Sequence, residues 1–105
     1  MGRAPGEARG ESDVGGTADV ECDAWVYMLR CRDGSLYTGW TTDVQQRLAR
    51  HQAGKASRYT ASRLPVELAL ALAMPDRTAA RREEARIKGL DRAGKLALLE
   101  AVTQM

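Results

Sequence analysis

The chain has 105 residues and a formal net charge of +2, enough for one compact domain that needs no disulfide to fold. The spacing of its two cysteines, Cys22 and Cys31, indicates neither a disulfide framework nor a metal cluster, so a reduced, cytoplasmic protein is expected. Its apolar runs are shorter than the roughly 18 residues of a membrane helix. Residues 1–16 lack the apolar core of a secretory signal, and we expect no membrane partner.

Charge is divided unevenly along the chain. Residues 1–24 hold two basic and six acidic residues, whereas the remainder holds 14 basic and eight acidic ones. Because the first segment has few branched aliphatic side chains to bury, we predict a disordered acidic extension over residues 1–24 and a folded domain over residues 25–105. The basic domain favours a nucleic-acid partner, although an ordinary charged surface explains the same balance.

Two β-prone runs open the domain, over residues 25–31 and 35–40. Between them, Asp33-Gly34 is typical of the turn that closes a tight hairpin. The two runs are therefore predicted to be antiparallel neighbours, with Tyr27 and Tyr37 close together across the sheet.

A helix is expected next, because Thr42 and Gln45 match a capping box with Thr42 as the N-cap. It should continue to about Ala53 and stop at Gly54. Its expected inward stripe is Val44, Leu48 and His51, bordered by Arg47. Residues 55–63 then read as a basic loop containing Ser and Thr.

The second half begins with an apolar run over residues 66–73 that fits either a strand or a helix by periodicity alone. Pro65 and Pro75 bracket a strand-length piece, so a strand is predicted. Asp76 is a suitable cap for a helix from Arg77 to about residue 90, and Asp91 for a last helix through residue 102. The expected order is β-β-α-β-α-α, an α+β domain with a small, mainly antiparallel three-stranded sheet flanked by helices.

Five ordered blocks between residue 25 and about residue 99 resemble the GIY-YIG nuclease superfamily, and its short stand-alone bacterial branch in particular. They are Trp25-Val26-Tyr27 with the run to Cys31, Leu36-Tyr37-Thr38-Gly39-Trp40 with the run to Asp43, Arg47-Leu48 with His51, Gly54-Lys55, and Ala80-x-Arg82-x-Glu84-x-x-Ile87-Lys88. Trp25 stands where the name motif has Gly, Thr38 where it has Ile, and Trp40 where several members carry a Lys near the scissile phosphate.

The resemblance implies a metal-dependent endonuclease that hydrolyses phosphodiester bonds in nucleic acid, with DNA favoured over RNA and Mg²⁺ or Mn²⁺ as cofactor. The alternative is a catalytically weak or inactive nucleic-acid-binding module of the same fold, since Trp40 replaces the Lys. A domain this small offers a small footprint, so an unknown protein partner or a homodimer is a candidate for targeting.

Four residues of the first half have catalytic roles in this resemblance. Tyr27 would activate or orient the attacking water, Tyr37 would bond near the phosphate, and Arg47 would clamp it with its forked donors. His51, the single histidine, would carry a proton or contact the phosphate. Without the resemblance, the tyrosines read as core aromatics, Arg47 as an ion-pair partner of Asp43, and His51 as a half-buried helix residue.

Glu84 is the predicted catalytic carboxylate and metal ligand. It lies four residues after Ala80 and three before Ile87, which places it on the inward stripe of its helix. A single carboxylate suits Mg²⁺, which keeps most of its waters. The competing interpretation is an ion pair with a neighbouring arginine.

Nucleic-acid contacts are assigned to Gly39, Lys55, Arg58 and Arg63. A Cβ at Gly39 would block substrate approach, or the glycine simply permits a turn. The basic loop, with Tyr59, suits phosphate contact and base stacking, although a solvated charged loop is an equally good interpretation. Trp40 is expected to pack against the fold rather than to stack on a base.

Overall fold

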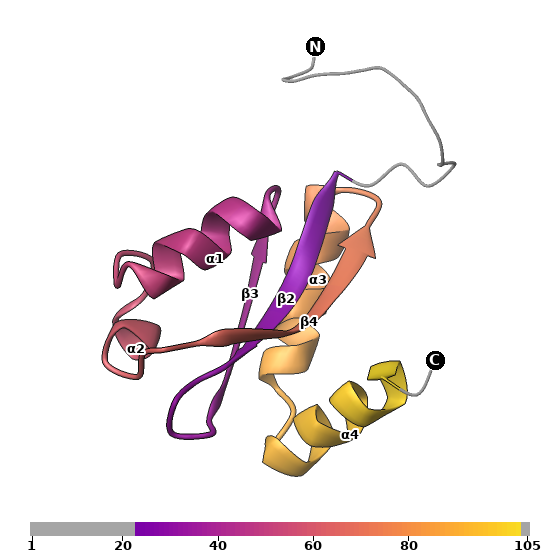
Figure 1. Cartoon of the computed structure of the whole chain (residues 1–105). Helices are drawn as coiled ribbons and strands as arrows, with labels where there is room; N and C mark the ends of the chain where they lie inside the picture. The colour runs from indigo at the N-terminus through magenta and orange to yellow at the C-terminus, as the bar shows by residue number, and fades with distance from the viewer. Residues whose placement is uncertain (1–22, 104–105) are drawn as a thin grey trace.

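The computed structural model describes residues 23–103, which form a three-stranded antiparallel sheet with helices on both faces (Figure 1). The elements in chain order are β2 (Ala24–Arg30), β3 (Leu36–Thr41), α1 (Val44–Gln52), α2 (Arg58–Ala61), β4 (Glu67–Met74), α3 (Arg77–Lys88) and α4 (Arg92–Thr103). The α+β class and the antiparallel sheet are therefore confirmed. Of the predicted acidic extension, residues 1–22 lie outside the described residues, and Ala24 already belongs to β2.

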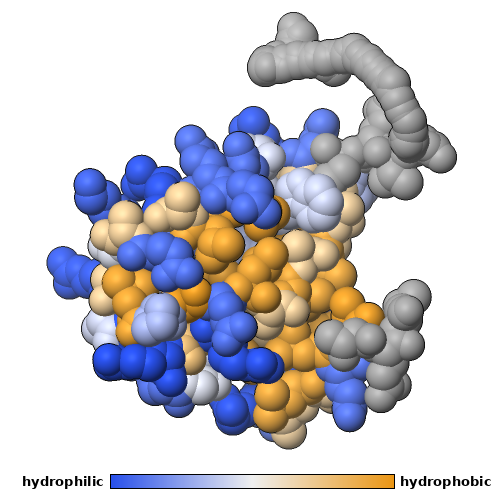
Figure 2. All heavy atoms as spheres, in the orientation of Figure 1, coloured by the Kyte–Doolittle hydropathy of each residue, from blue (hydrophilic) through white to orange (hydrophobic). Residues whose placement is uncertain are grey.

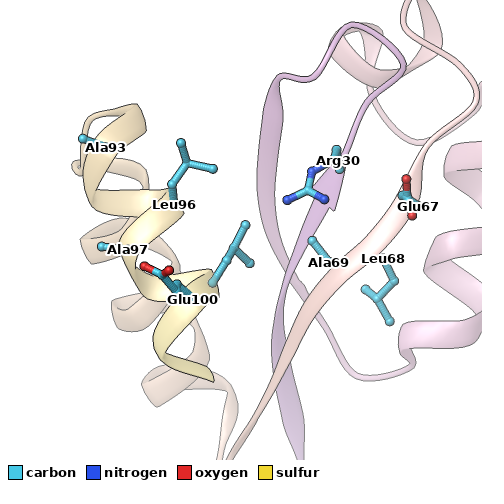
Figure 3. A pocket seen from close by; sticks show the side chains of 9 residues that line it. Arg30, Glu67, Leu68, Ala69, Ala93, Leu96, Ala97 and Glu100 are labelled. Atoms are coloured by element: carbon cyan, nitrogen blue, oxygen red, sulfur yellow. The ribbon is translucent and has the colours of Figure 1, made fainter. Parts of the chain in front are cut away.

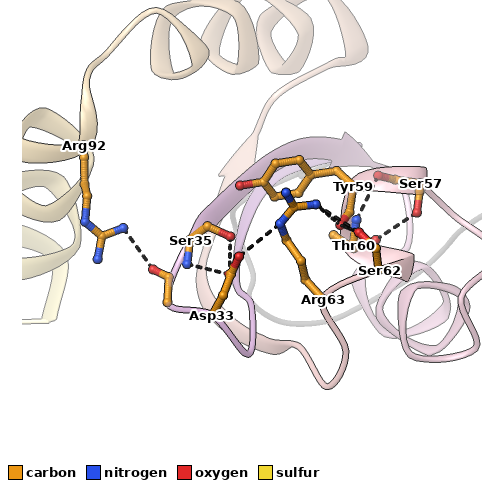
Figure 4. Close-up of polar contacts among 9 residues, drawn as sticks. Asp33, Ser35, Ser57, Tyr59, Thr60, Ser62, Arg63 and Arg92 are labelled. Atoms are coloured by element: carbon orange, nitrogen blue, oxygen red, sulfur yellow. Dashed lines mark hydrogen bonds and ion pairs between the residues drawn. The ribbon is translucent and has the colours of Figure 1, made fainter.

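The strand order is β3-β2-β4, so the first strand of the sheet is its centre. The predicted hairpin joins β2 to β3, and Gly34 occupies the left-handed conformation, with φ of +86°, that its tight turn requires. Two arginines from distant segments hold this turn: Arg63 bonds Asp33 at 3.1 Å, and Arg92 donates to the Gly34 carbonyl at 2.9 Å (Figure 4).

Alternation along the strands separates two apolar clusters, one on each face of the sheet. The larger cluster joins Val26 and Met28 of β2 to Ile87 of α3 and Leu99 of α4. The smaller one joins Tyr27 and Leu29 to Leu48 of α1. Helices α3 and α4 thus cover one face, while α1 and the segment that contains α2 cover the face that carries the tyrosines.

The start of α1 differs from the predicted capping box by one residue. Asp43, not Thr42, is the N-cap, and its carboxylate accepts from the Gln46 amide at 3.0 Å. The hydroxyl of Thr41 in turn accepts from the Asp43 amide at 3.1 Å, which fixes the capping residue. The predicted stop is confirmed, because Gly54 adopts φ of +75° just after the helix.

The predicted loop over residues 55–63 is wrong in one respect, because it contains the short helix α2. Ser57 caps this helix, and its hydroxyl accepts from the Thr60 amide. A four-residue helix buries too few side chains to show an apolar period, so no periodic pattern predicted it.

The predicted strand and the two last helices are confirmed. Asp76 caps α3 through the Ala79 amide, and Asp91 accepts from the Gly94 amide at 2.8 Å in the first turn of α4. Within residues 23–103, no helix combines the length and the apolar character needed to cross a membrane. Figure 2 shows hydrophobic side chains gathered over β4 and beside α4, while hydrophilic ones gather along α1.

An open groove separates α4 from the ends of β2 and β4 (Figure 3). Arg30 and Glu67 stand on the strand side of this groove, and Leu96 and Glu100 stand on the helix side. None of the five predicted catalytic residues lines it. The groove is therefore separate from the tyrosine-bearing site.

Candidate active site

Tyr27 and His51 form the centre of the candidate site. The Tyr27 hydroxyl lies 2.9 Å from Nε2 of His51, and the two side chains are 2% and 1% exposed. Tyr27 comes from the central strand, and His51 comes from the last turn of α1 on the stripe that the sequence predicted. The structure therefore joins two predicted catalytic residues, 24 positions apart, by a buried hydrogen bond.

Tyr37 completes an aromatic group around this bond. Its ring centroid lies 6.5 Å from that of Tyr27 and 5.2 Å from the His51 imidazole. On its outer side Tyr37 stacks against Tyr59, which is 39% exposed. The expected closeness of Tyr27 and Tyr37 is confirmed, and Tyr59 extends the aromatic group to the surface.

Gly39 leaves the space that the Tyr27 ring occupies. It pairs with Tyr27 across the hairpin, and a Cβ built on it would lie 2.6 Å from the Tyr27 oxygen and 2.7 Å from Cζ. Gly39 also lies inside β3 rather than at a turn. The turn interpretation of this glycine is therefore wrong, because its missing side chain is the space that the tyrosine fills.

Electrostatics keep both partners of the central hydrogen bond neutral. Burial raises the pKa of Tyr27 to about 12, the adjacent Tyr37 adds to this, and the nearby Arg47 guanidinium opposes it. Burial, reinforced by Arg47, holds the pKa of His51 below its usual value. At neutral pH the pair is therefore a protonated tyrosine and an uncharged imidazole.

Arg47 and Glu84 belong to helices on opposite faces of the sheet. Arg47 lies on α1, and its expected alternative partner, Asp43, caps the helix instead; no ion pair joins the two within residues 23–103. Glu84 lies on α3, and its charge contributes to the high pKa of Tyr27. The charges of both side chains, one cationic and one anionic, therefore act on the proton affinity of the tyrosine.

Glu84 also has a lysine partner rather than the arginine that the competing interpretation expected. Its carboxylate is 3.2 Å from Nζ of Lys88, one turn later, and its side chain is 22% exposed. The arginine contact belongs to Glu83, which Arg86 holds through two bonds and whose pKa it lowers. An exposed i,i+4 pair contributes only tenths of a kcal/mol, so Glu84 remains available to a stronger ligand.

The four residues assigned to nucleic-acid contact lie differently. Lys55, which precedes α2, and Arg58, the first residue of α2, are both exposed. Arg63 already donates to Asp33, to the Tyr59 carbonyl and to the Ser62 hydroxyl, and its guanidinium lies 3.8 Å from the Tyr59 ring centroid (Figure 4). Arg63 therefore braces Tyr59 against the hairpin turn.

Comparison with known proteins gives a family match that spans most of the described residues. Residues 23–97 match the GIY-YIG catalytic domain. The chain belongs to the GIY-YIG family. A UPF0213 protein of Streptococcus sanguinis is 51% identical over 85 residues, which cover 81% of this chain and 98% of that relative. One from Halobacterium salinarum is 49% identical over 73 residues, covering 70% and 95% respectively.

A solved relative of this chain has the same fold. The solution NMR structure of a UPF0213 protein from Bacillus halodurans is 42% identical, with a TM-score of 0.51, and the match covers 74% of this chain and 83% of that one. The recognition of a short stand-alone GIY-YIG protein from its sequence blocks is therefore confirmed.

Two further residues of the GIY-YIG domain are placed by the structure. Trp40 packs against the larger apolar cluster, on the face opposite Tyr37 and Gly39, so its expected packing role is confirmed. Thr60 was missed: it is 0% exposed and lies 2.8 Å from Nδ1 of His51. Ser57, three residues earlier, is a local N-cap signal for α2, but nothing in the sequence connects Thr60 to a histidine nine positions away.

Proposed function

We propose that this chain is a metal-dependent endonuclease that hydrolyses phosphodiester bonds in nucleic acid, with DNA favoured over RNA. The observation that carries the proposal is the buried 2.9 Å hydrogen bond between Tyr27 and His51, whose tyrosine also senses the charges of Arg47 and Glu84. Membership of the GIY-YIG family, whose nucleases generally use divalent metals and act on nucleic acid, supports the same reaction.

The high pKa of Tyr27 decides how the water is activated. With a pKa of about 12, Tyr27 is almost entirely protonated at neutral pH and cannot serve as a preformed base. It can accept a proton from water only if it gives its own proton away at the same time. His51 is neutral and bonded to that hydroxyl, so it is the acceptor that the geometry provides.

In the proposed hydrolysis, two proton transfers accompany the attack of water on phosphorus. One proton of the attacking water moves to the Tyr27 oxygen while the Tyr27 proton moves to Nε2 of His51. The resulting hydroxide forms a bond to phosphorus, and the bond from phosphorus to the leaving sugar oxygen breaks. That oxygen takes a proton from solvent, and His51 returns its proton to bulk water. Arg47 stabilises the charge that develops on the phosphoryl oxygens, and Tyr37 donates a hydrogen bond near them.

The donor set fits a hard cation that needs few protein ligands. Within residues 23–103 there is no group of three or more His, Cys, Asp or Glu side chains able to hold a metal. Mg²⁺ typically takes one or two carboxylates and completes its shell with water and substrate phosphate, so Glu84 alone suffices as the protein ligand. Bound there, Mg²⁺ or Mn²⁺ would supply Lewis-acid stabilisation of the phosphate.

Lys55, Arg58 and Arg63 are proposed to contact the phosphate backbone on either side of the cleaved bond. They project from one segment next to Tyr37, and Gly39 leaves the adjacent strand without a side chain. Such contacts position the backbone without reading sequence, which suits a small footprint.

One observation favours the second candidate, a catalytically weak or inactive nucleic-acid-binding module. Trp40 fills the position of the expected Lys, and its side chain packs on the sheet face away from the tyrosines. No cation therefore reaches the phosphate from this position, and Arg47 is left as the cation next to Tyr27.

A cleavage assay separates the two candidates. Wild type, Glu84→Gln and Glu83→Gln would be incubated with supercoiled plasmid, single-stranded DNA, branched DNA and structured RNA, with Mg²⁺, with Mn²⁺ and with chelator. Glu83 is the matched control, because it neighbours Glu84 but is held by Arg86. Metal-dependent cutting by wild type and Glu83→Gln, and none by Glu84→Gln, is expected. Equal cutting by all three would exclude Glu84, and salt-sensitive binding without cutting would favour the binding module.

A further inference from the structure

Thr60 lies against the second ring nitrogen of His51, the one that Tyr27 does not contact. Its hydroxyl oxygen lies 2.8 Å from Nδ1 of the imidazole, and both residues are buried. The same hydroxyl lies 3.3 Å from the carbonyl of Ser57, the residue that caps α2. Thr60 therefore links the start of α2 to the histidine of α1.

The direction of these hydrogen bonds follows from the atoms involved. A carbonyl oxygen can only accept, so the Thr60 hydroxyl donates its single proton to Ser57. With its proton directed there, the Thr60 oxygen is placed to accept from His51, an arrangement that puts a proton on Nδ1. A neutral imidazole has only one N–H, so Nε2 is left with a lone pair that faces the Tyr27 hydroxyl.

We propose that Thr60 is a positioning residue that fixes His51 as the Nδ1–H tautomer and so keeps Nε2 ready to receive the proton of Tyr27. In the opposite tautomer, Nε2 would donate to Tyr27 and could not accept its proton. The effect on cleavage rests on the proposed nuclease function, whereas the tautomer itself does not.

One substitution removes the hydrogen bond between Thr60 and His51 with little change of shape. Valine has nearly the shape of threonine but no hydroxyl, so Thr60→Val deletes the acceptor for Nδ1. The Ser57 carbonyl keeps a partner in this variant, because it also accepts from the Ala61 amide at 2.9 Å. Thr60→Ser restores the hydroxyl. Thr38→Val is the matched control, since Thr38 is a buried threonine whose hydroxyl has no partner among the described residues.

The tautomer can be measured without any substrate. His51 is the single histidine of the chain, so a long-range proton–nitrogen correlation spectrum of the labelled full chain contains one imidazole. Recorded above the pKa of an ordinary histidine, it should show Nδ1 protonated and Nε2 unprotonated in wild type, Thr60→Ser and Thr38→Val. In Thr60→Val, the signal of the Nε2–H form should appear.

Cleavage rates give the second measurement. Thr60→Val should cut about tenfold to 100-fold more slowly than wild type, and Thr60→Ser should recover most of the rate. This loss is smaller than the roughly 100-fold to 10,000-fold that general acid–base catalysis contributes as a whole, because the variant keeps both Tyr27 and His51. An Nε2–H tautomer in wild type, or an unchanged tautomer in folded Thr60→Val, would overturn the proposal. If Thr60→Val does not fold, the wild-type spectrum still decides. The expected tautomers without cleavage of any substrate would instead refute the nuclease function alone.

Discussion

Gly39→Ala should disable the site through a contact inside the hairpin. The added Cβ would lie 2.6 Å from the Tyr27 oxygen, and ordinary contacts begin near 3.4 Å, so one of the two groups must move. The new atom is attached to the backbone of a paired strand and cannot shift without breaking the pairing. The tyrosine ring is buried and bonded to His51, but it can rotate about its side-chain bonds. The ring must therefore tilt away from Gly39, and its hydrogen bond to His51 is strained or lost.

The size of the effect follows from that displacement. Forcing an extra carbon into a packed region costs about 1–3 kcal/mol of unfolding free energy. A catalytic group displaced by about 1 Å loses on the order of 100-fold in rate. We therefore expect Gly39→Ala to lower the melting temperature modestly and the cleavage rate by about 100-fold. Thermal unfolding and the cleavage assay on the preferred substrate measure the two effects.

Gly89→Ala is the matched control for this substitution. The built Cβ at Gly89 would make contacts of 3.5 Å and 3.7 Å, which are ordinary distances, and its backbone is right-handed. This variant should keep the wild-type rate. Because Tyr27→Phe already removes the reacting oxygen, adding Gly39→Ala to it should lower the residual rate little further. A fully active and stable Gly39→Ala would refute the reasoning.

Two further outcomes are expected. First, the cleavage rate should fall as pH decreases through the pKa of His51, which lies below the usual value of about 6.5, because only neutral His51 accepts a proton. Arg47 lowers this pKa, so Arg47→Gln should move the acid side of the pH–rate profile to higher pH. His51 also adds stability above its unfolded pKa that is lost as pH falls through the folded one, so the melting temperature should decrease over the same range. Second, Ile87→Ala should cost about 2–5 kcal/mol in denaturant unfolding, because Ile87 is fully buried; Leu96→Ala, at an exposed position, should cost far less, and equal losses would contradict the assigned core.

Local signals in the sequence predicted most elements correctly. The Asp33-Gly34 turn, the Gly54 helix stop and the Asp76 cap each act within a few residues, so their outcome is set by neighbouring backbone groups. The exceptions are also local. Asp43 replaced Thr42 as the cap because both are good capping residues and the preceding Thr41 hydroxyl binds the Asp43 amide.

The sequence also indicated most members of the candidate site, through the ordered GIY-YIG blocks and the inward stripes of two helices. Tertiary structure decided how these residues interact. The Tyr27–His51 bond joins a strand to a helix, and the Tyr37–Tyr59 stack joins a strand to α2, contacts between segments that no periodicity connects. The lysine partner of Glu84, by contrast, is a local contact, because Lys88 lies one turn later on the same helix.

Residue types and spacing thus determined the family, the α+β fold and the candidate chemistry, because these depend on local propensity and on ordered motifs. Only the tertiary structure decided that Gly39 makes room for the Tyr27 ring within the hairpin, that burial raises the pKa of this tyrosine to about 12, and that Thr60 binds His51. Burial and long-range hydrogen bonds arise only when the chain closes on itself, and they are what adjust the proton affinities of these side chains.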